Sequence, residues 1–410
     1  MIKNLHNFFL YLYAFTIPFE YWDPFGLVGV FSIVKLIAIF YFIFSFVNGK
    51  NSFSLEKVKM YMYPMFALFG IMVLINLMSL SVIPVSQSPV NIAFLQNLLL
   101  FLLLSNHFSS DYLLKYKVLL AYVLGIILLG ILFSLEIGIV IRQERLSVFG
   151  DNPNNQGTKV SIGIFIILFL VLRDKLNLKY FRFLLLLPLQ LLLDFMVSSG
   201  SRGALLSLFL SLFLLIFLFK FKSNALKSAF IIVGLVGALY LYDKVMSNEL
   251  LNKRMEQFTE EGSLGGREDI WEDVFVMIEN APVIGLGEPG FTYEMTKIYG
   301  HSKSAHNYFI YIFVTSGIIG LSLFLFFLSK IFITSYRSYK MDNEPVYIIL
   351  FALIVFAMFR SGGTLGDKSY WFFLAMIVGA QFDFKKIALN SISIDNEFNT
   401  DYQIKEVIKS

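Results

Sequence analysis

The residues best suited to chemistry lie in three polar stretches between long apolar runs. Arg202 lies within Ser-Ser-Gly-Ser-Arg-Gly-Ala, Arg267 follows two glycines, and His306 precedes Asn307. A guanidinium group can bind phosphate through two parallel hydrogen bonds, and a neutral imidazole can accept a proton from a hydroxyl group. These residue types predict a site that holds a phosphate group and activates a hydroxyl, with Arg202, Arg267 and His306 as its catalytic residues.

The sequence around each residue supports this interpretation. Small residues around Arg202 would let neighbouring segments approach closely and leave its guanidinium partly desolvated. The glycines before Arg267 expose backbone N–H groups at the start of a predicted helix, where anions bind. His306 is predicted to begin an apolar helix near Ala305, whose positive end would keep the imidazole neutral. Ser302 and Ser304 could cap that helix.

Each of these three residues could instead have a purely structural role. Arg202 could anchor a helix–helix turn at the membrane interface, and Arg267 could belong to a capping turn. His306 could simply make an interfacial hydrogen bond, and His301 is a weaker candidate of the same kind.

A second polar stretch, residues 145–157, predicts substrate contacts. It reads Arg-Leu-Ser-Val-Phe-Gly-Asp-Asn-Pro-Asn-Asn-Gln-Gly. Asn, Pro and Gly favour turns, so a plain external turn is one interpretation. The other is a cup of amide side chains suited to sugar hydroxyls, with Arg145 and Asn154 binding substrate. Asn307, beside the candidate base, is a further predicted substrate contact.

The stretch from Gly285 to Gly290 matches the letters of a dinucleotide-binding motif. The motif requires a strand before it and a helix after it. No strand is predicted before this stretch, and Pro289 should break the helix after it. We therefore reject nucleotide binding. A tight turn against the membrane surface or a glycan is expected instead, with Gly285 and Gly287 as substrate contacts.

The composition indicates a polytopic membrane protein. The 410 residues are 57% hydrophobic and 15% charged, whereas soluble domains are about one quarter charged. Apolar segments near the roughly 20-residue spanning length predict an all-α fold with about twelve transmembrane helices. These segments are 8–22, 26–48, 61–80, 91–105, 118–141, 157–172, 183–198, 203–219, 228–246, 305–329, 345–360 and 369–383.

The distribution of Lys and Arg predicts the orientation. With a cytoplasmic N-terminus, every predicted cytoplasmic loop holds at least two Lys or Arg, whereas the opposite loop 81–91 holds none and the loop 243–304 is acidic on balance. Both termini are therefore expected in the cytoplasm, and the candidate site on the external face, away from His6 and His107. We divide the chain into helices 1–9 (1–242), an external loop (243–304), helices 10–12 (305–383) and a cytoplasmic tail (384–410).

The external loop is expected to be structured. Residues 264–279 have a helical pattern with Ile270, Val274, Met277 and Ile278 on one face, and Asn-Ala-Pro282 ends it. This amphipathic helix should lie along the membrane surface. The acidic residues of the loop are spaced like a solvated helix face, so no metal site is predicted. The chain has no Cys, which excludes a thiolate nucleophile and a disulfide.

Taken together, these motifs resemble the O-antigen ligase and O-antigen polymerase family of bacterial membrane glycosyltransferases. The resemblance rests on Ser201-Arg202-Gly-Ala, on Gly-Arg267-x-x-x-Trp followed by Pro282-x-x-Gly-x-Gly, and on His306-Asn307 followed by Ser316-Gly-x-x-Gly. The Asn-Pro-Asn sequence after Arg145 and the layout of spans around one large late loop are also similar. One departure is Thr315, where many members carry Glu.

The resemblance implies a metal-independent inverting transferase with a GT-C-like membrane fold in the bacterial inner membrane. The donor would be an undecaprenyl-diphosphate-linked glycan. Arg202 and Arg267 would hold the diphosphate, and His306 would activate the acceptor hydroxyl. No cofactor and no nucleic acid are expected, and a flippase and a chain-length regulator of the same pathway are possible partners.

Three functions fit these expectations. The first is a polymerase that joins lipid-linked oligosaccharide units of an O-antigen or capsule. The second is a ligase that moves the finished glycan to lipid A core or another acceptor. The third is a transporter of the same lipid-linked glycan, although few mid-membrane charges and no repeat halves are evident.

Overall fold

A computed structural model describes residues 2–26, 32–81, 83, 90–142, 145–261, 266–360 and 365–381. The predicted tail, 384–410, lies outside the described residues, as does Gly265. The α-helices of the first part are α1 (Ile2–Thr16), α2 (Ile33–Val47), α3 (Leu55–Leu80), α4 (Ile92–Phe108), α5 (Tyr112–Ser134), α6 (Pro153–Leu172), α7 (Leu189–Ser198), α8 (Arg202–Leu218) and α9 (Asn224–Ser247).

The second part contains α10 (Glu249–Glu261), α11 (Arg267–Asn280), α12 (Gly287–Tyr299), α13 (Tyr308–Asp342) and α14 (Val346–Arg360), followed by a helix over residues 368–381. Short 3₁₀ segments η1 (Ile17–Phe19), η2 (Lys50–Phe53) and η3 (Lys179–Leu186) connect some of them. Each predicted apolar segment overlaps a helix of the structure.

The described residues form a mainly α-helical membrane protein and include one small antiparallel hairpin. Six helical segments are long and apolar enough to cross a membrane, judged by length and composition over the described residues. They are 55–80, 112–134, 153–172, 179–198, 224–247 and 308–342. Shorter apolar helices are α2, α4, α8 and α14. The number of about twelve spans stays a prediction.

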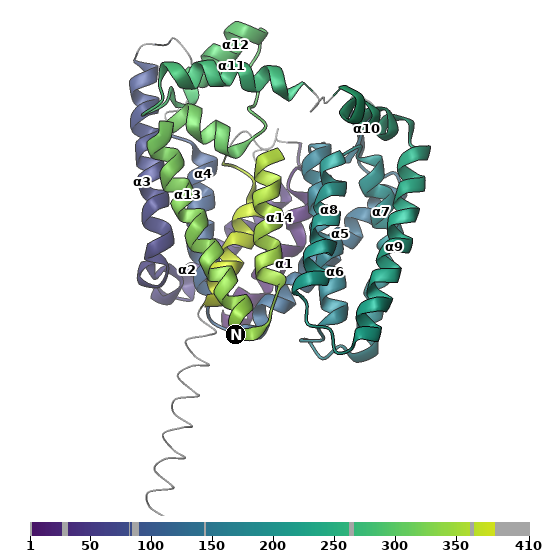
Figure 1. Ribbon diagram of the computed structural model, residues 1–410. Helices are drawn as coiled ribbons and strands as arrows, with labels where there is room; N and C mark the ends of the chain where they lie inside the picture. The colour runs from purple at the N-terminus through teal and green to yellow at the C-terminus, as the bar shows by residue number, and fades with distance from the viewer. Residues whose placement is uncertain are drawn as a thin grey trace, which may run out of the picture.

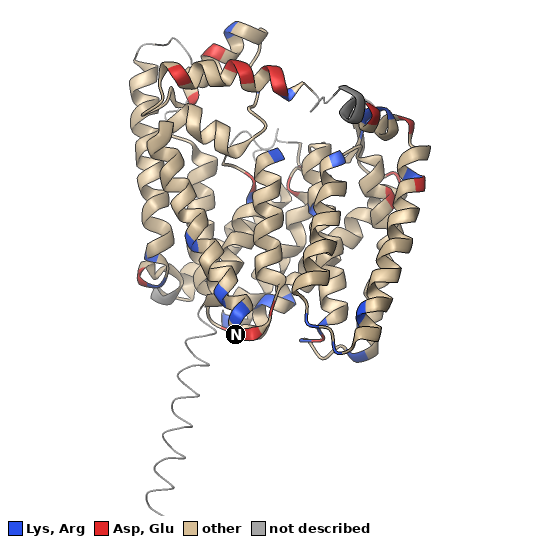
Figure 2. Ribbon diagram, in the orientation of Figure 1, with Lys and Arg blue, Asp and Glu red and all other residues tan. Residues whose placement is uncertain are grey.

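Figure 1 shows the helices side by side as a bundle, with the N-terminus at one end and α10, α11 and α12 across the other. Helix α6 and the helix over 368–381 are buried on nearly all sides. Beyond the polar first turns of α6, their sequences are mainly apolar on all faces, as expected for helices enclosed by other helices. Figure 2 shows acidic residues along α11, and many of the Lys and Arg at the opposite end of the bundle.

Several predicted boundaries were wrong for local reasons. The apolar run 118–141 continues past the end of α5 at Ser134, because Ile139–Arg142 forms strand β1, paired antiparallel with β2 (Arg145–Val148). The Asn-Pro-Asn sequence is the start of α6 and not a turn. Asn152 is its N-cap, accepting a hydrogen bond from the Asn154 N–H at 2.9 Å, and Pro153 occupies the first helical position.

The amphipathic helix predicted from residues 264–279 is confirmed. Helix α11 covers Arg267–Asn280 and buries Ile270, Val274, Met277 and Ile278, the four residues predicted for its inner face. In contrast, Pro289 does not prevent a helix. It lies in the first turn of α12, where a missing N–H costs no intrahelical hydrogen bond. Helix α10 was not predicted either.

Two glycine motifs that are distant in the sequence form one joint. Gly317 has φ 62° and ψ −168°, which interrupts α13. The turn at Pro282–Leu286 fills the interruption: the N–H of Ile318 donates to the Pro282 carbonyl at 2.9 Å, and that of Leu286 to the Val314 carbonyl at 2.8 Å. A Cβ at Gly317 would collide with the Val283 carbonyl. The joint therefore fixes the turn between α11 and α12 to α13.

Candidate functional site

Five arginines from separate elements gather at the end of the bundle that carries α10 and α11. They are Arg145 in β2, Arg202 at the start of α8, Arg254 in α10, Arg267 at the start of α11, and Arg360 at the end of α14. Arg145, Arg254 and Arg267 each lie close enough to Arg202 for the charges to interact. The fold thus concentrates positive charge from residues more than 200 positions apart.

All of these arginines except Arg145 line one cavity of about 340 Å³. The rest of its lining is mainly apolar and comes from α8, α9 and α14, including Leu205, Phe209, Leu241, Tyr242 and Phe359. We call this cavity the apolar groove. Guanidinium groups beside an apolar wall suit a ligand that is anionic at one end and hydrocarbon at the other.

The loop between α7 and α8 holds two of the arginines, Arg145 and Arg254, through its backbone carbonyls. The Ser199 carbonyl accepts a hydrogen bond from Arg145 Nε at 2.9 Å, and the Gly200 carbonyl accepts one from Arg254 Nη1 at 2.8 Å. Arg202 Nη1 donates to the Arg254 carbonyl at 2.6 Å. Ser201 caps α8 by accepting from the Ala204 N–H. The small residues of this loop therefore bring carbonyl groups to the guanidinium groups.

The position of the Arg360 side chain explains why a glycine, Gly203, follows Arg202. Its Nη2 donates to Thr158 Oγ1 at 3.2 Å and to Ser207 Oγ at 3.1 Å, so the guanidinium lies across the first turn of α8. A Cβ at Gly203 would overlap the Arg360 guanidinium. Only a residue without a side chain leaves room for this arginine.

The charges within the cluster are mutually unfavourable. Burial, then Arg254, Arg267 and Arg202, lowers the pKa of Arg145 from 12.5 to about 10. Burial and neighbouring arginines also lower the pKa values of Arg254 and Arg267. Glu268 acts in the opposite direction on Arg267. A bound anion would relieve both the desolvation and the repulsion, which marks the cluster as an anion site.

A second cavity, of about 380 Å³, has a different character. Its lining includes amides, hydroxyls, carboxylates and aromatic rings: Tyr21, Asn152, Asn154, Asn155, Glu288, Phe291, Thr292, Ser302, Lys303, Ser304, His306, Tyr311 and Asp367. We call it the polar chamber. Asn154 lines both cavities and accepts a hydrogen bond from Arg145 Nη2 at 2.8 Å. The two cavities therefore meet at the first turn of α6.

His306 lies in the polar chamber, and hydrogen bonds at its own N–H and at the carbonyl of the preceding residue fix its backbone. Its backbone has φ 50°, a left-handed conformation that His adopts more readily than most residues, and its N–H donates to Ser304 Oγ at 3.1 Å. Trp271 Nε1 donates to the neighbouring Ala305 carbonyl at 2.9 Å. Trp271 also lines the apolar groove, so α11 connects His306 to the arginine cluster.

The pKa of the His306 imidazole is lowered, but the cause is not the helix end that the sequence predicted. Burial is the largest cause of its lowered pKa, followed by the charges of Arg267 and Lys303. Helix α13 begins only at Tyr308, and its cap is Asn307, whose Oδ1 accepts from the N–H groups of Phe309 and Ile310 at 2.9 and 3.2 Å. His306 therefore precedes the helix instead of beginning it.

Two carboxylic acids in the chamber have raised pKa values. Burial, then Glu20, raises the pKa of Asp367 to about 6; its oxygens accept hydrogen bonds from Asn155 Nδ2 at 3.3 Å and the Tyr308 hydroxyl at 2.6 Å. Burial also raises the pKa of Glu288, which accepts from Asn91 Nδ2 at 3.1 Å. Such acids, amides and aromatic faces are suited to sugar hydroxyls and rings.

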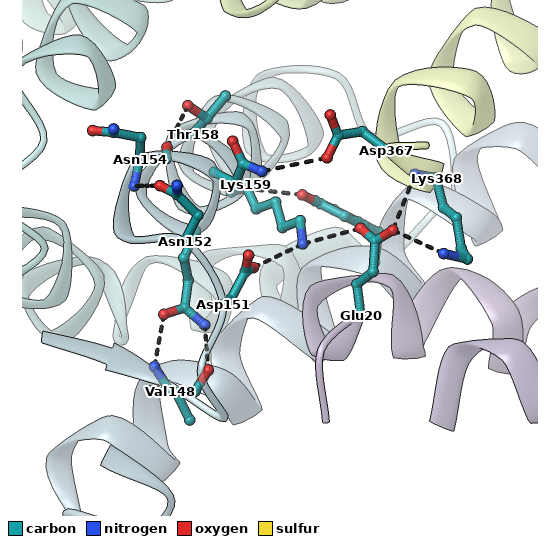
Figure 3. A network of polar contacts seen from close by, with 12 residues as sticks. Glu20, Val148, Asp151, Asn152, Asn154, Thr158, Lys159, Asp367 and Lys368 are labelled. Atoms are coloured by element: carbon teal, nitrogen blue, oxygen red, sulfur yellow. Dashed lines mark hydrogen bonds and ion pairs between the residues drawn. The ribbon is translucent and has the colours of Figure 1, made fainter. Parts of the chain in front are cut away.

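A buried charge network supports the turn that carries the chamber's asparagines (Figure 3). Lys159 Nζ donates to Asp151 Oδ2 at 2.9 Å and lies 3.2 Å from Glu20 Oε2. Lys368 Nζ donates to Glu20 Oε1 at 3.0 Å. The network ties the end of η1, the turn before α6 and the helix over 368–381 together, so the first turn of α6 is fixed in place.

The predicted site residues separate into two groups. Arg145, Arg202, Arg267, Asn154 and His306 converge around the two cavities. Gly285, Gly287 and Asn307 have packing or capping roles and line neither cavity: a Cβ would lie 2.6 Å from the Ser316 nitrogen at Gly285 and 2.9 Å from Asn76 Oδ1 at Gly287. Substrate binding by these three stays a prediction. His301 is exposed and lies outside both linings.

Sequence reasoning missed Arg254, Arg360 and the chamber acids as site residues. Arg360 is a lone cation at the end of an apolar helix, and this position could have marked it as a site residue in the sequence. Arg254 lies in an unpredicted helix, and Glu288 in a segment interpreted as a turn. No group of three His, Asp or Glu that could hold a metal ion occurs among the described residues.

Comparison with known proteins found a match between part of the chain and one protein family. No curated protein matches the chain. Residues 187–325 match the model of the family described as O-antigen ligase. The matched region contains Arg202, Arg254, Arg267 and His306, four of the residues that surround the two cavities. The match covers about a third of the 410 residues, so this part of the chain is similar to the O-antigen ligase family.

Proposed function

We propose that the chain is a glycosyltransferase that polymerises undecaprenyl-diphosphate-linked oligosaccharide units of a bacterial surface polysaccharide. The observation that carries this proposal is the pair of cavities that meet at Asn154: an apolar groove with four arginines, and a polar chamber with His306. The groove suits the diphosphate and lipid of the donor. The chamber suits the sugar that provides the acceptor hydroxyl.

The reaction is a single displacement. The acceptor hydroxyl gives its proton to the neutral imidazole of His306, while its oxygen forms a bond to the anomeric carbon of the donor. The bond from that carbon to the diphosphate breaks, and its electron pair leaves with the lipid diphosphate. The imidazolium then releases its proton to water. Displacement of this kind inverts the anomeric configuration.

Fixed positive charges are the main catalytic requirement in this scheme. Negative charge grows on the diphosphate as the bond breaks, and guanidinium groups already in place stabilise it without reorganisation. Arg202, Arg254 and Arg267 are positioned by backbone contacts and by the start of a helix. Because guanidinium groups supply the charge, we expect turnover to continue in the presence of a metal chelator.

The family description favours a second candidate, a ligase that transfers the finished glycan from undecaprenyl diphosphate to lipid A core or another acceptor. The donor chemistry is the same, and only the occupant of the chamber differs. In either case we propose an inner-membrane protein with cytoplasmic termini and an external active site, working with a flippase and a chain-length regulator.

A glycan gel tests these functions in cells that lack the gene and carry either wild type or His306→Ala. We expect His306→Ala to yield single-unit glycan only, and the exposed control His301→Ala to give a normal ladder. Long lipid-linked chains that never reach their final acceptor would instead identify a ligase. A normal ladder from His306→Ala would contradict its catalytic role and favour transport.

A further inference from the structure

A third cavity lies at the other end of the bundle, where α1 and α3 begin and α2 and α4 end. Its volume is about 250 Å³. It is lined by Lys3, His6, Asn48, Ser52, Lys57, Asn106, His107, Ser109 and Ser110, and no Asp or Glu is among these described residues. We call it the basal cavity. Its side chains are cationic or hydrogen-bonding, which is the composition of an anion site.

Two stacked histidines form its floor. The rings of His6 and His107 are 3.8 Å apart between centroids and nearly parallel. His107 Nδ1 is 3.2 Å from the Tyr41 hydroxyl and Nε2 is 2.8 Å from Asn7 Oδ1, while His6 Nε2 is 2.8 Å from Ser45 Oγ. These contacts fix both rings. Lys3 and Lys57, both exposed, provide flexible positive charge at the opening.

Asn106 indicates that the ligand also carries a hydrogen-bond donor. Its Nδ2 donates to the carbonyls of Ser52, Ser54 and Leu102 at 3.0–3.2 Å. Its Oδ1 is buried and accepts no hydrogen bond from any described residue. A buried acceptor without a donor is unfavourable, so a ligand hydroxyl at this position would satisfy it.

The surface around the basal cavity favours a lipid as the source of this group. Phe46 and Val47, directly before Asn48, are 70% and 55% exposed, and Met60 on α3 is 41% exposed. Apolar side chains beside a cationic cavity at a bundle end match the boundary between headgroups and acyl chains. Figure 2 shows further Lys and Arg at this end.

We propose that the basal cavity binds the headgroup of an anionic phospholipid whose phosphodiester carries a free hydroxyl, as in phosphatidylglycerol. The phosphate lies between Lys3 and Lys57, and the headgroup hydroxyl donates to Asn106 Oδ1. This site is separate from the two cavities of the proposed transferase, and its occupancy does not depend on that function.

The experiment measures lipid binding to the purified full chain in a neutral detergent by native mass spectrometry. The probes are phosphatidylglycerol, phosphatidylcholine and soluble glycerol phosphate. The variant is Lys3→Gln/Lys57→Gln, and the control is Lys59→Gln, which removes an exposed charge from the same helix outside the cavity. Thermal unfolding without added lipid confirms that the variants are folded.

We expect phosphatidylglycerol to bind wild type and Lys59→Gln equally and the double variant at least about tenfold more weakly, since two charge-assisted contacts are lost. Phosphatidylcholine, which has no hydroxyl donor and no net charge, should bind wild type at least about tenfold more weakly. Equal losses in the double variant and the control, or equal binding of the two lipids, would overturn the proposal. Glycerol phosphate binding as tightly as the lipid would overturn the lipid assignment.

Discussion

At the residue scale, the central property of His306 is its lowered pKa, which extends the pH range of the neutral imidazole downward. Burial and two cations lower its pKa below 6.5, so protonation is delayed as the solution becomes more acidic. A general base works only when unprotonated. Activity limited by His306 is therefore present above its lowered pKa and is lost as the pH falls through it.

The acid limb of the pH profile should respond to Lys303. Replacing Lys303 by Gln removes one of the cations that disfavour imidazolium, so the pKa of His306 rises and the acid limb of kcat/KM moves to higher pH. Burial is the larger cause, so the limb should stay below pH 6.5. The control is Lys297→Gln on α12, outside the chamber. An unchanged limb in Lys303→Gln would show that another group controls it.

Gly203 allows a test of Arg360 without changing the arginine itself. In Gly203→Ala, the new methyl group must displace the flexible guanidinium, while the first turn of α8 keeps its backbone. We expect turnover to fall about tenfold or more, as for loss of one charge-assisted contact, with little change in thermal stability. An active Gly203→Ala enzyme would exclude a role for the position of Arg360.

At the element scale, the joint between α13 and the Pro282–Leu286 turn determines where His306 lies. Gly317→Ala combines a backbone conformation that is almost restricted to glycine with a collision against Val283. The conformation alone costs about 1–3 kcal/mol. We expect a clear drop in thermal stability and loss of activity.

The matched control is Gly234→Ala in the middle of α9, where a Cβ meets no atom within 4 Å. Alanine stabilises an ordinary helical position by about 0.5–1 kcal/mol relative to glycine. Thermal unfolding of both variants in one detergent should therefore show a lower stability than wild type for Gly317→Ala and a higher stability for Gly234→Ala. If both variants are equally stable, the joint has no structural importance.

At the scale of the whole molecule, the two cavities predict separable kinetic effects. With a short-tailed lipid-linked donor and a lipid-free acceptor glycan, Arg254→Gln should raise the KM of the donor about tenfold or more, because a charge-assisted contact is lost. Asn155→Ala should raise the KM of the acceptor. Equal changes of both constants in both variants would contradict the assignment of cavities to substrates.

The sequence predicted the helical bundle because long apolar runs and an amphipathic period are local signals. It also identified Arg202, Arg267 and His306, whose residue types stand out against apolar surroundings. It could not show that Gly285 and Gly317 belong to one joint, or that Arg254 and Arg360 join the cluster. Those facts depend on contacts between segments that are distant in the sequence, which no local pattern of residues reveals.

Helix α9 stands at the edge of the bundle and yet forms part of the groove wall (Figure 1). Leu241 is the one buried residue along this helix, all of which the structure describes. Ala238, Tyr242 and Val245 line the groove together with Leu241. In a bilayer, most of the remaining apolar side chains of α9 face acyl chains, so the polyprenyl tail of the proposed donor can enter from the side without crossing water, where each exposed CH₂ costs about 0.8 kcal/mol. Donor capture then becomes a two-dimensional encounter. Its rate follows the number of donor molecules per unit area of membrane, and a tail longer than the groove adds nothing to recognition.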